Sequence, residues 1–326
     1  MTDTPLLSVR DLVVQFPTRK GVLTAVDGVS FDIQRGEVLG VVGESGAGKS
    51  MTGAAIIGLI EPPGRIASGQ VLLDGERIDN LLVNQMRRVR GKKVGVVFQD
   101  PLTSLNPLYT VAQQLVETVR THLPLSEKQA REHALALLDE VGIPAAKRRM
   151  DDYPHQFSGG MRQRVVIALA LAAEPELVIA DEPTTALDVS VQAQIIDVLK
   201  RLCSERGAAV MLITHDMGVI AETADRVAVM YAGRVAEIGP VRDVVQHAKH
   251  PYTQGLMGSI PTLAHDSDRL VQIHGSMPRL IDIPPGCAFN PRCEHAFDRC
   301  RQERPSPIQE GDRAVACWLS DQEAGQ

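Results

Sequence analysis

The chain has 326 residues, of which 44% are hydrophobic and 3% aromatic, and its net charge at pH 7 is −6. This length is enough for one large core, or for one core plus an appendage, and aliphatic side chains must fill the interior because aromatic ones are scarce. The negative charge argues against a general nucleic-acid binder, and no apolar run reaches the ~20 residues that span a bilayer.

The first third of the chain is predicted to be rich in strands. Strand-like composition occurs at residues 9–16, 29–33, 38–42, 70–73 and 94–98. The first residues of the chain also lack the basic and apolar regions of a signal peptide, so we expect a cytosolic protein without structural disulfides. The strand at 38–42 is apolar throughout, as expected of a strand that is buried on both faces.

A glycine-rich loop follows this apolar strand. It consists of Gly43, Glu44, Ser45, Gly46, Ala47, Gly48, Lys49 and Ser50, and an amphipathic run over residues 49–60 comes next. Glycines let backbone N–H groups approach phosphate oxygens, and the start of a helix directs its positive end at the same anion. Lys49 adds a charge, and the Ser50 hydroxyl is suited to ligate Mg²⁺. A chance glycine turn is the alternative, but spacing and context both favour a nucleoside triphosphate site.

Helical patterns dominate the middle of the chain. One helix is predicted to begin at residue 111, and a second begins at a capping box formed by Ser126 and Gln129 and stops at Gly142. A third helix is predicted over residues 161–173. We expect these helices to form an insertion within an α/β domain.

Strands and helices alternate again in the following part. Strands are predicted at residues 177–180, 209–214 and 227–230, and a helix over residues 191–204. This alternation predicts a parallel sheet with helices on both faces, so the expected fold class is α/β.

Two further motifs bear on the chemistry of the triphosphate. The strand at 177–180 ends in Asp181, which is placed to supply a Mg²⁺ contact, and in Glu182, which could polarise an attacking water. Ordinary acids at a strand end are the alternative. Ser158 and Gly160 stand just before the third helix and form a second anion nest. One nucleotide does not need two nests, so we expect a second subunit to complete each site.

In the order of these motifs the chain resembles the ATP-binding subunits of ABC (ATP-binding cassette) transporters. Residues 43–50 match the Walker A motif, 97–100 the Q-loop, 157–161 the signature, 177–182 Walker B, 186–188 (Ala186, Leu187 and Asp188) the D-loop and 214–216 the switch histidine. Phe157 and Met161 depart from the usual Leu and Gln of the signature.

The resemblance implies a P-loop NTPase fold. It comprises a RecA-like core with an N-terminal antiparallel β portion (residues 1–109 and 174–249), a helical signature subdomain (110–173) and a small cysteine-containing C-terminal extension (250–326). Two such subunits would sandwich two ATP molecules head to tail.

The resemblance also implies a role for each matching residue. Lys49 and the loop amides would hold the β- and γ-phosphates, and Phe16 would stack on adenine unless it is a core residue. Ser50, Gln99 and Asp181 would surround Mg²⁺, Glu182 would orient or deprotonate water, and His215 would contact the γ-phosphate. Ser158 and Gly160 would reach the ATP of the opposite subunit, and Asp188 belongs to the nucleotide site.

One branch of this family is particularly similar, the ATPases of dipeptide and oligopeptide importers, with nickel importers nearby. Residues 43–46, 98–107, 153–156 and 250–254 are typical of it. The resemblance implies a second homologous ATPase, two membrane permease subunits and an extracytoplasmic binding protein as partners, and a peripheral place at the cytoplasmic face of the membrane. An ATPase of another small-solute importer, an exporter ATPase, an ABC ATPase without a membrane partner and a non-hydrolysing scaffold are the alternatives.

Four of the five cysteines lie in the extension, at Cys287, Cys293, Cys300 and Cys317. A four-cysteine cluster in a cytosolic protein favours a metal, either Zn²⁺ or an iron–sulfur cluster. No Cys-x-x-Cys pair is present, and the resemblance to the peptide branch implies a [4Fe–4S] cluster. Free or oxidised thiols are the third possibility. Cys203 is predicted to be a packing residue.

Overall fold

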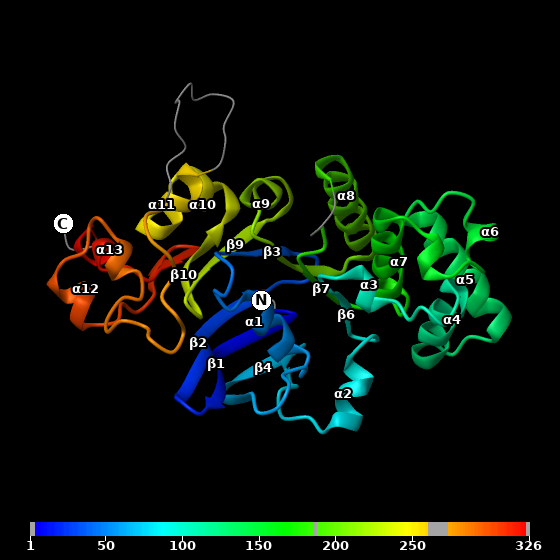
Figure 1. The fold of residues 1–326 in the computed structure, drawn as a ribbon, viewed down its shortest axis with the longest axis horizontal. Coiled ribbons are helices and arrows are strands. Elements are labelled where there is room, and N and C mark those ends of the chain that lie inside the picture. Colours follow the sequence, from blue (N-terminus) through cyan, green and yellow to red (C-terminus); the bar gives the residue numbers. More distant parts are fainter. Residues whose placement is uncertain (1–3, 185–187, 260–272, 324–326) are drawn as a thin grey trace. The chain divides into compact units, whose positions relative to one another are not determined.

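The computed structural model describes residues 4–184, 188–259 and 273–323 (Figure 1). The chain divides into two compact units. Unit 1 consists of Met1–Leu6, Ile33–Glu37 and Asn80–Ile213, and unit 2 of Leu7–Asp32, Val38–Asp79 and Thr214–Gln326. Within the described residues, no helix combines the length and the apolar character that a transmembrane span requires.

Unit 1 is built on three parallel strands. β7 (Leu177–Asp181) pairs with β6 (Val94–Val97) on one side and with β8 (Ala209–Ile213) on the other. Nearly every residue of these strands is buried, as expected for a parallel sheet that helices cover. The sequence prediction of short, continuously apolar strands here is confirmed.

The helices of unit 1 include the predicted insertion. They are α2 (Val83–Val89), α3 (Pro101–Ser104), α4 (Val111–His122), α5 (Glu127–Glu140), α6 (Ala146–Arg149), α7 (Gly159–Leu171) and α8 (Val189–Arg206), with a 3₁₀ turn η1 (Pro154–Gln156). α4 and α5 pack against α7, and α6 packs against α5 (Figure 1). The capping box of α5 forms as predicted, with the Ser126 amide donating to Gln129 Oε1 at 3.0 Å.

Unit 2 contains an antiparallel sheet from the N-terminal part of the chain. Its strand order is β2 (Gly21–Ile33), β1 (Leu7–Thr18), β4 (Arg65–Leu73) and β5 (Glu76–Arg77). β1 and β4 are antiparallel, with Leu7 opposite Leu73 and Val9 opposite Val71, so apolar side chains pair on the buried face. This sheet is the N-terminal β portion that the sequence predicts.

A second group of strands in unit 2 joins the phosphate loop to the C-terminal extension. β3 (Val38–Val42) is parallel to β9 (Arg226–Tyr231), and β9 is antiparallel to β10 (Arg234–Pro240). β10 then pairs with β12 (Arg313–Val315), and β12 with β11 (Ile308–Glu310). Neither β10 nor the two short strands is predicted from the sequence, and β11 and β12 add the extension to this sheet.

Helices and turns of unit 2 complete the description. They are α1 (Lys49–Ile56), α9 (Met217–Thr223), α10 (Val241–Gln246), α11 (Pro251–Gly258), η2 (Asn290–Arg292), α12 (Asp298–Gln302) and α13 (Trp318–Glu323). α1 is shorter than the amphipathic run predicted over residues 49–60.

A buried ion pair holds the extension to the sheet. The side chain of Glu237, on β10, is fully buried and accepts hydrogen bonds from both Nε and Nη2 of Arg313, on β12. Its other oxygen accepts from the His250 amide at 3.0 Å. Glu237 therefore fixes both β12 and the start of α11.

Candidate functional site

The phosphate loop leads from β3 into α1 in a conformation that requires its glycines. Gly43 has φ +148°, and a Cβ there would lie 2.2 Å from the carbonyl oxygen of Met230. Gly48 has φ +100°, and its Cβ would lie 2.7 Å from the carbonyl oxygen of Ala25. Since both obstacles are backbone atoms, no other residue fits at either position.

Lys49, the first residue of α1, is folded back over the loop. Its side chain is buried, and Nζ donates to the carbonyl oxygens of Gly43 at 2.8 Å and Glu44 at 3.1 Å. The Ala47 amide also donates to the Glu44 carbonyl, at 3.1 Å. The ammonium group thus lies within the concave turn where a phosphate would bind.

Not every amide of the loop faces the phosphate position. The Glu44 amide donates to the hydroxyl of Tyr252 at 2.9 Å, so this N–H is used by α11 of the extension. The resemblance to ABC ATPases implies that the amides of residues 43–50 all hold phosphate, whereas the structure gives the Glu44 amide another partner.

The two predicted acids lie at the end of β7 in unit 1. Asp181 is the last residue of the strand, and Glu182 follows with φ +44°, a left-handed conformation that is strained for a side chain with a Cβ. The backbone amide of Glu182 donates to the Ile213 carbonyl at 2.8 Å. The side chain of Glu182 accepts, through Oε2, a hydrogen bond from Gln99 Nε2 at 3.1 Å. Gln99 and Glu182, 83 residues apart, are therefore brought together.

The second anion nest lies at the start of α7. Ser158 is exposed and caps this helix, its Oγ accepting from the Met161 amide at 3.4 Å. A Cβ at Gly160 would lie 2.9 Å from a Val191 methyl group, so glycine allows α8 to pack closely. Phe157 is buried, which accounts for an apolar residue where the signature has leucine.

The remaining predicted residues lie in both units. Asp188 Oδ1 accepts from the Val191 amide at 2.9 Å and caps α8, whereas Ala186 and Leu187 lie outside the described residues. His215 is exposed just after β8. Phe16 lies on β1, half-buried, and its ring packs closely against Gly64. Ser50, Phe16 and His215 belong to unit 2.

Four cysteines of the extension line one small cavity of about 10 Å³. Cys287, Cys293, Cys300 and Cys317 contribute to its wall, together with His250, which the sequence analysis does not single out. Among the described residues, however, no group of three or more His, Cys, Asp or Glu side chains is arranged to hold a metal ion. The donor set suits a thiophilic metal, but a cavity of this size holds one water molecule.

The environment of three of these thiols, Cys287, Cys293 and Cys317, favours their protonated form. Burial raises the pKa of Cys287 and Cys293, and it raises that of Cys317 to about 11. Negative charge on the neighbouring cysteines adds to each increase. None of the five cysteines lies in a disulfide, and burial raises the pKa of Cys203, on α8, to about 12.

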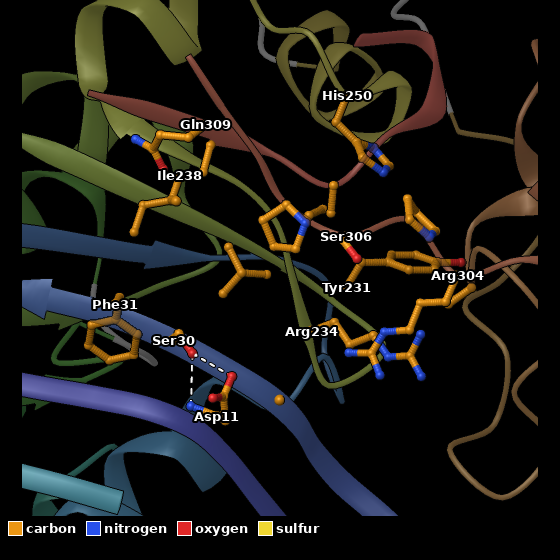
Figure 2. A pocket seen from close by; sticks show the side chains of 18 of the residues that line it. Asp11, Ser30, Phe31, Tyr231, Arg234, Ile238, His250, Arg304, Ser306 and Gln309 are labelled. Carbon is orange, nitrogen blue, oxygen red and sulfur yellow. Dashed lines mark hydrogen bonds between the residues drawn. The ribbon is translucent and has the colours of Figure 1, made fainter. Parts of the chain in front are cut away.

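A larger cavity, of about 650 Å³, lies in unit 2 between β2, β9, β10 and the loop at residues 304–307 (Figure 2). Arg234 and Arg304 lie side by side in its wall, opposite Phe31 and Ile238. Both arginines donate hydrogen bonds to Asp27. Burial raises the pKa of this carboxyl, but the two guanidinium groups outweigh burial and hold the pKa below its usual value. Tyr231 also lines this cavity (Figure 2).

Comparison with families of known proteins gives two matches. The family described as ABC transporter matches residues 26–185. The family described as oligopeptide/dipeptide transporter, C-terminal region, matches residues 236–300.

The chain is similar to curated proteins over nearly its full length. The dipeptide transport ATP-binding protein DppD of Bacillus subtilis (strain 168) is 48% identical, covering 98% of this chain and 96% of that protein. The protein of the same name from Escherichia coli (strain K12) is 46% identical, covering 92% of each chain.

Solved structures share the fold. One is a dimeric post-hydrolysis state of the ATP-binding cassette MJ0796 bound to ADP and Pi, with 29% identity and a TM-score of 0.66, covering 72% of this chain and 99% of that one. Another is cbiO1 from Clostridium perfringens, part of the ABC transporter complex cbiONQ, with 30% identity and a TM-score of 0.64, covering 75% and 92%.

Proposed function

The chain belongs to the ATP-binding proteins of ABC transporters, in the branch for dipeptides and oligopeptides, and on this premise we propose how its residues work. It hydrolyses ATP and powers peptide import as part of a transporter complex with membrane components. The roles of individual residues, the composition of the complex and the metal of the extension are proposals.

The geometry of the phosphate loop carries the proposal. Gly43 and Gly48 have backbone conformations and surroundings that exclude any side chain, and Lys49 lies within the turn. This nest at the start of a helix binds the β- and γ-phosphates of ATP. Phe16 supplies a ring for adenine.

Mg²⁺ would be held by oxygen atoms of Ser50, Gln99 and Asp181, which are the hard ligands that this ion prefers. When bound, it neutralises the charge that develops on the phosphates. The Glu182 carboxylate orients the attacking water and takes its proton, and the hydrogen bond from Gln99 supports the position of that carboxylate. His215 donates to the γ-phosphate.

A second ATPase subunit completes each ATP site. The exposed Ser158 at the start of α7, with Gly160, supplies donors to the γ-phosphate bound by the neighbouring subunit. Asp188, which caps α8, would also belong to the nucleotide site. Hydrolysis removes charge that holds the two subunits together, so the dimer opens and moves the membrane subunits.

The Glu182→Gln variant tests this mechanism in the assembled complex. We expect ATP to bind and the dimer to stay closed, while turnover falls by about 100-fold or more because the general base is lost. Glu205→Gln, at an exposed position on α8, is the matched control and should keep full activity. Near-normal hydrolysis by Glu182→Gln would remove Glu182 from this role.

The partners are a second homologous ATPase, two permease subunits and an extracytoplasmic binding protein, with the chain peripheral at the cytoplasmic face of the membrane. Exposed apolar side chains of unit 1, the first of them next to Gln99 in the chain, support a docking surface on this unit. They are Phe98, Leu102, Leu108, Tyr109 and Tyr153, of which Leu108 is 80% exposed. Apolar side chains so exposed commonly mark a contact with another protein.

Copurification tests this docking surface. Leu108→Asp should reduce recovery of the membrane subunits, because it places a charge in the contact. Val22→Asp, at a 57% exposed position on β2, should leave recovery unchanged. Equal recovery with both variants would exclude Leu108 from the contact.

The four cysteines of the extension hold a metal centre, for which the resemblance to the peptide branch favours a [4Fe–4S] cluster over Zn²⁺. The convergence of four sulfur-bearing side chains on one cavity supports the donor set. Because the cavity is small, these side chains must move apart to admit a cluster.

Anaerobic purification with a visible spectrum and iron and zinc analysis decides the metal. Iron with a brown colour, lost in Cys300→Ser but kept in Cys203→Ser, is the expected result. Colourless protein with one equivalent of zinc would replace the cluster by Zn²⁺, and protein without either metal would refute the metal centre.

A further inference from the structure

An arginine of the extension reaches the phosphate loop. Arg292 ends η2, and its Nη1 donates to both carboxylate oxygens of Glu44, at 2.9 and 3.1 Å. It also donates to the Tyr231 hydroxyl at 3.3 Å and to the carbonyls of His274 at 2.9 Å and Gly275 at 3.3 Å. With a side chain only 7% exposed and this many acceptors, the guanidinium has one well-defined position.

A second residue of the extension holds the same position of the loop. The hydroxyl of Tyr252, which is fully buried, accepts the Glu44 amide at 2.9 Å. The Glu44 carbonyl in turn accepts from Lys49 and from the Ala47 amide. Glu44 is therefore held through its carboxylate and amide by the extension, and through its carbonyl by the residues that form the cradle.

The charge of Glu44 gives this contact a role beyond packing. A carboxylate one residue from Gly43 would repel the triphosphate, and the repulsion is strong where water is partly excluded. Arg292 neutralises that carboxylate and fixes its direction. Without the arginine, Glu44 would keep its charge beside the nucleotide and would be free to turn toward it.

The contact is embedded in the folded extension. The Arg292 guanidinium lies 5.8 Å from the ring centroids of Tyr231 and Phe289, and those rings pack on Tyr252. A Cβ added at Gly46 would lie 3.2 Å from the Met277 methyl group, so a further part of the extension lies against the loop.

We propose that Arg292 is a positioning residue for the phosphate loop, which makes the affinity for the phosphates of ATP depend on the C-terminal extension. The inference rests on the proposed binding of ATP by this loop. Arg292 does not touch the nucleotide; it acts through Glu44, and Tyr252 supports it through the Glu44 amide.

The test compares ATP with adenosine, which lacks phosphates, on the full chain by titration calorimetry. Arg292→Met should raise the Kd for ATP about tenfold, because it leaves an unpaired carboxylate beside the phosphates, and change the Kd for adenosine by less than about twofold. Arg292→Lys keeps the charge, so its Kd for ATP should lie between those of Arg292→Met and the wild type. The double variant that combines Arg292→Met with Glu44→Gln should recover most of the affinity for ATP.

Arg301→Met is the matched control. Arg301 also stands next to a cysteine, but its side chain is 62% exposed and pairs only loosely with Asp298, at 3.6 Å. The Kd of Arg301→Met for ATP should stay within about twofold of the wild-type value.

If the wild type binds ATP, the proposed function stands, and three outcomes would still overturn the inference. They are an unchanged Kd for ATP in Arg292→Met, an equal loss of affinity for ATP and for adenosine, and no recovery of ATP affinity when Glu44→Gln is added. If Arg292→Met does not fold, Arg292→Lys and the double variant answer the same question, because each also allows the change in Kd for ATP to be compared with the change in Kd for adenosine. Failure of the wild type to bind ATP would instead refute the proposed function.

Discussion

Gln99 Nε2 donates a hydrogen bond of 3.1 Å to Glu182 Oε2. The two residues follow neighbouring parallel strands, β6 and β7, whose carboxyl ends lie at one edge of the sheet. This edge is where ligands bind in open α/β sheets. The amide thus constrains the carboxylate that is proposed to act on water.

Gln99→Ala should lower ATP hydrolysis by the assembled complex about 10- to 100-fold, because a misplaced general base is a poor catalyst. The Kd for ATP, measured without Mg²⁺, should change little because the phosphate loop is intact. Since both residues act in one step, adding Gln99→Ala to Glu182→Gln should cause no further loss. Gln129→Ala, in the exposed cap of α5, serves as the control, and steady-state phosphate release is the measurement. A fully additive loss would show that Gln99 acts separately.

Gly43→Ala should destabilise the protein by about 3–5 kcal/mol, because its Cβ meets a backbone carbonyl and its φ is strained for any other residue. Gly75→Ala is the control. It shares a positive φ, +77°, but has no atom within 4 Å of the added Cβ. It should cost only about 1–2 kcal/mol. Urea unfolding measures both, and equal losses would refute the steric argument.

Arg313→Met should destabilise the protein by about 3–5 kcal/mol, because it leaves the fully buried Glu237 without its counter-ion. Converting both residues to methionine should restore only part of this loss, because the buried His250 amide then loses its acceptor. Arg201→Met breaks an exposed pair with Glu205 and an exposed hydrogen bond to the Glu140 carbonyl, and it should cost only about 1 kcal/mol. Denaturant titration of the three variants checks the order, and a small effect of Arg313→Met would contradict it.

His250 should make stability depend on pH between about 6.5 and 4. Burial lowers its pKa to about 4, and its Nδ1 accepts the Tyr252 amide, which requires the neutral ring. The unfolded chain, with a pKa near 6.5, binds a proton first as the pH falls. Stability is therefore full above pH 6.5 and falls below it, by about 3 kcal/mol at pH 4.

His250→Gln should flatten this part of the pH profile, whereas His155→Gln, at an exposed position of η1, should leave it unchanged. Thermal unfolding over the pH range measures the difference between the variants. An equally steep profile in His250→Gln would assign the dependence to other groups.

The sequence by itself determined the features that depend on residues only a few positions apart in the chain. The phosphate loop needs glycine at set positions between a strand and a helix, and the cap of α5 needs Ser126 three residues before Gln129. Such patterns are local, so their physical requirements are visible in a few consecutive residues. The parallel strands of unit 1 were predictable for the same reason, since continuous burial requires apolar runs.

Only the tertiary structure decided how the extension meets the loop. Arg292 and Glu44 are 248 residues apart, and Tyr252 and Glu44 are 208 apart. The strands β11 and β12 have three residues each, too few to show a period. A single arginine or tyrosine carries no signal of its distant partner, because folding rather than sequence spacing brings the two together.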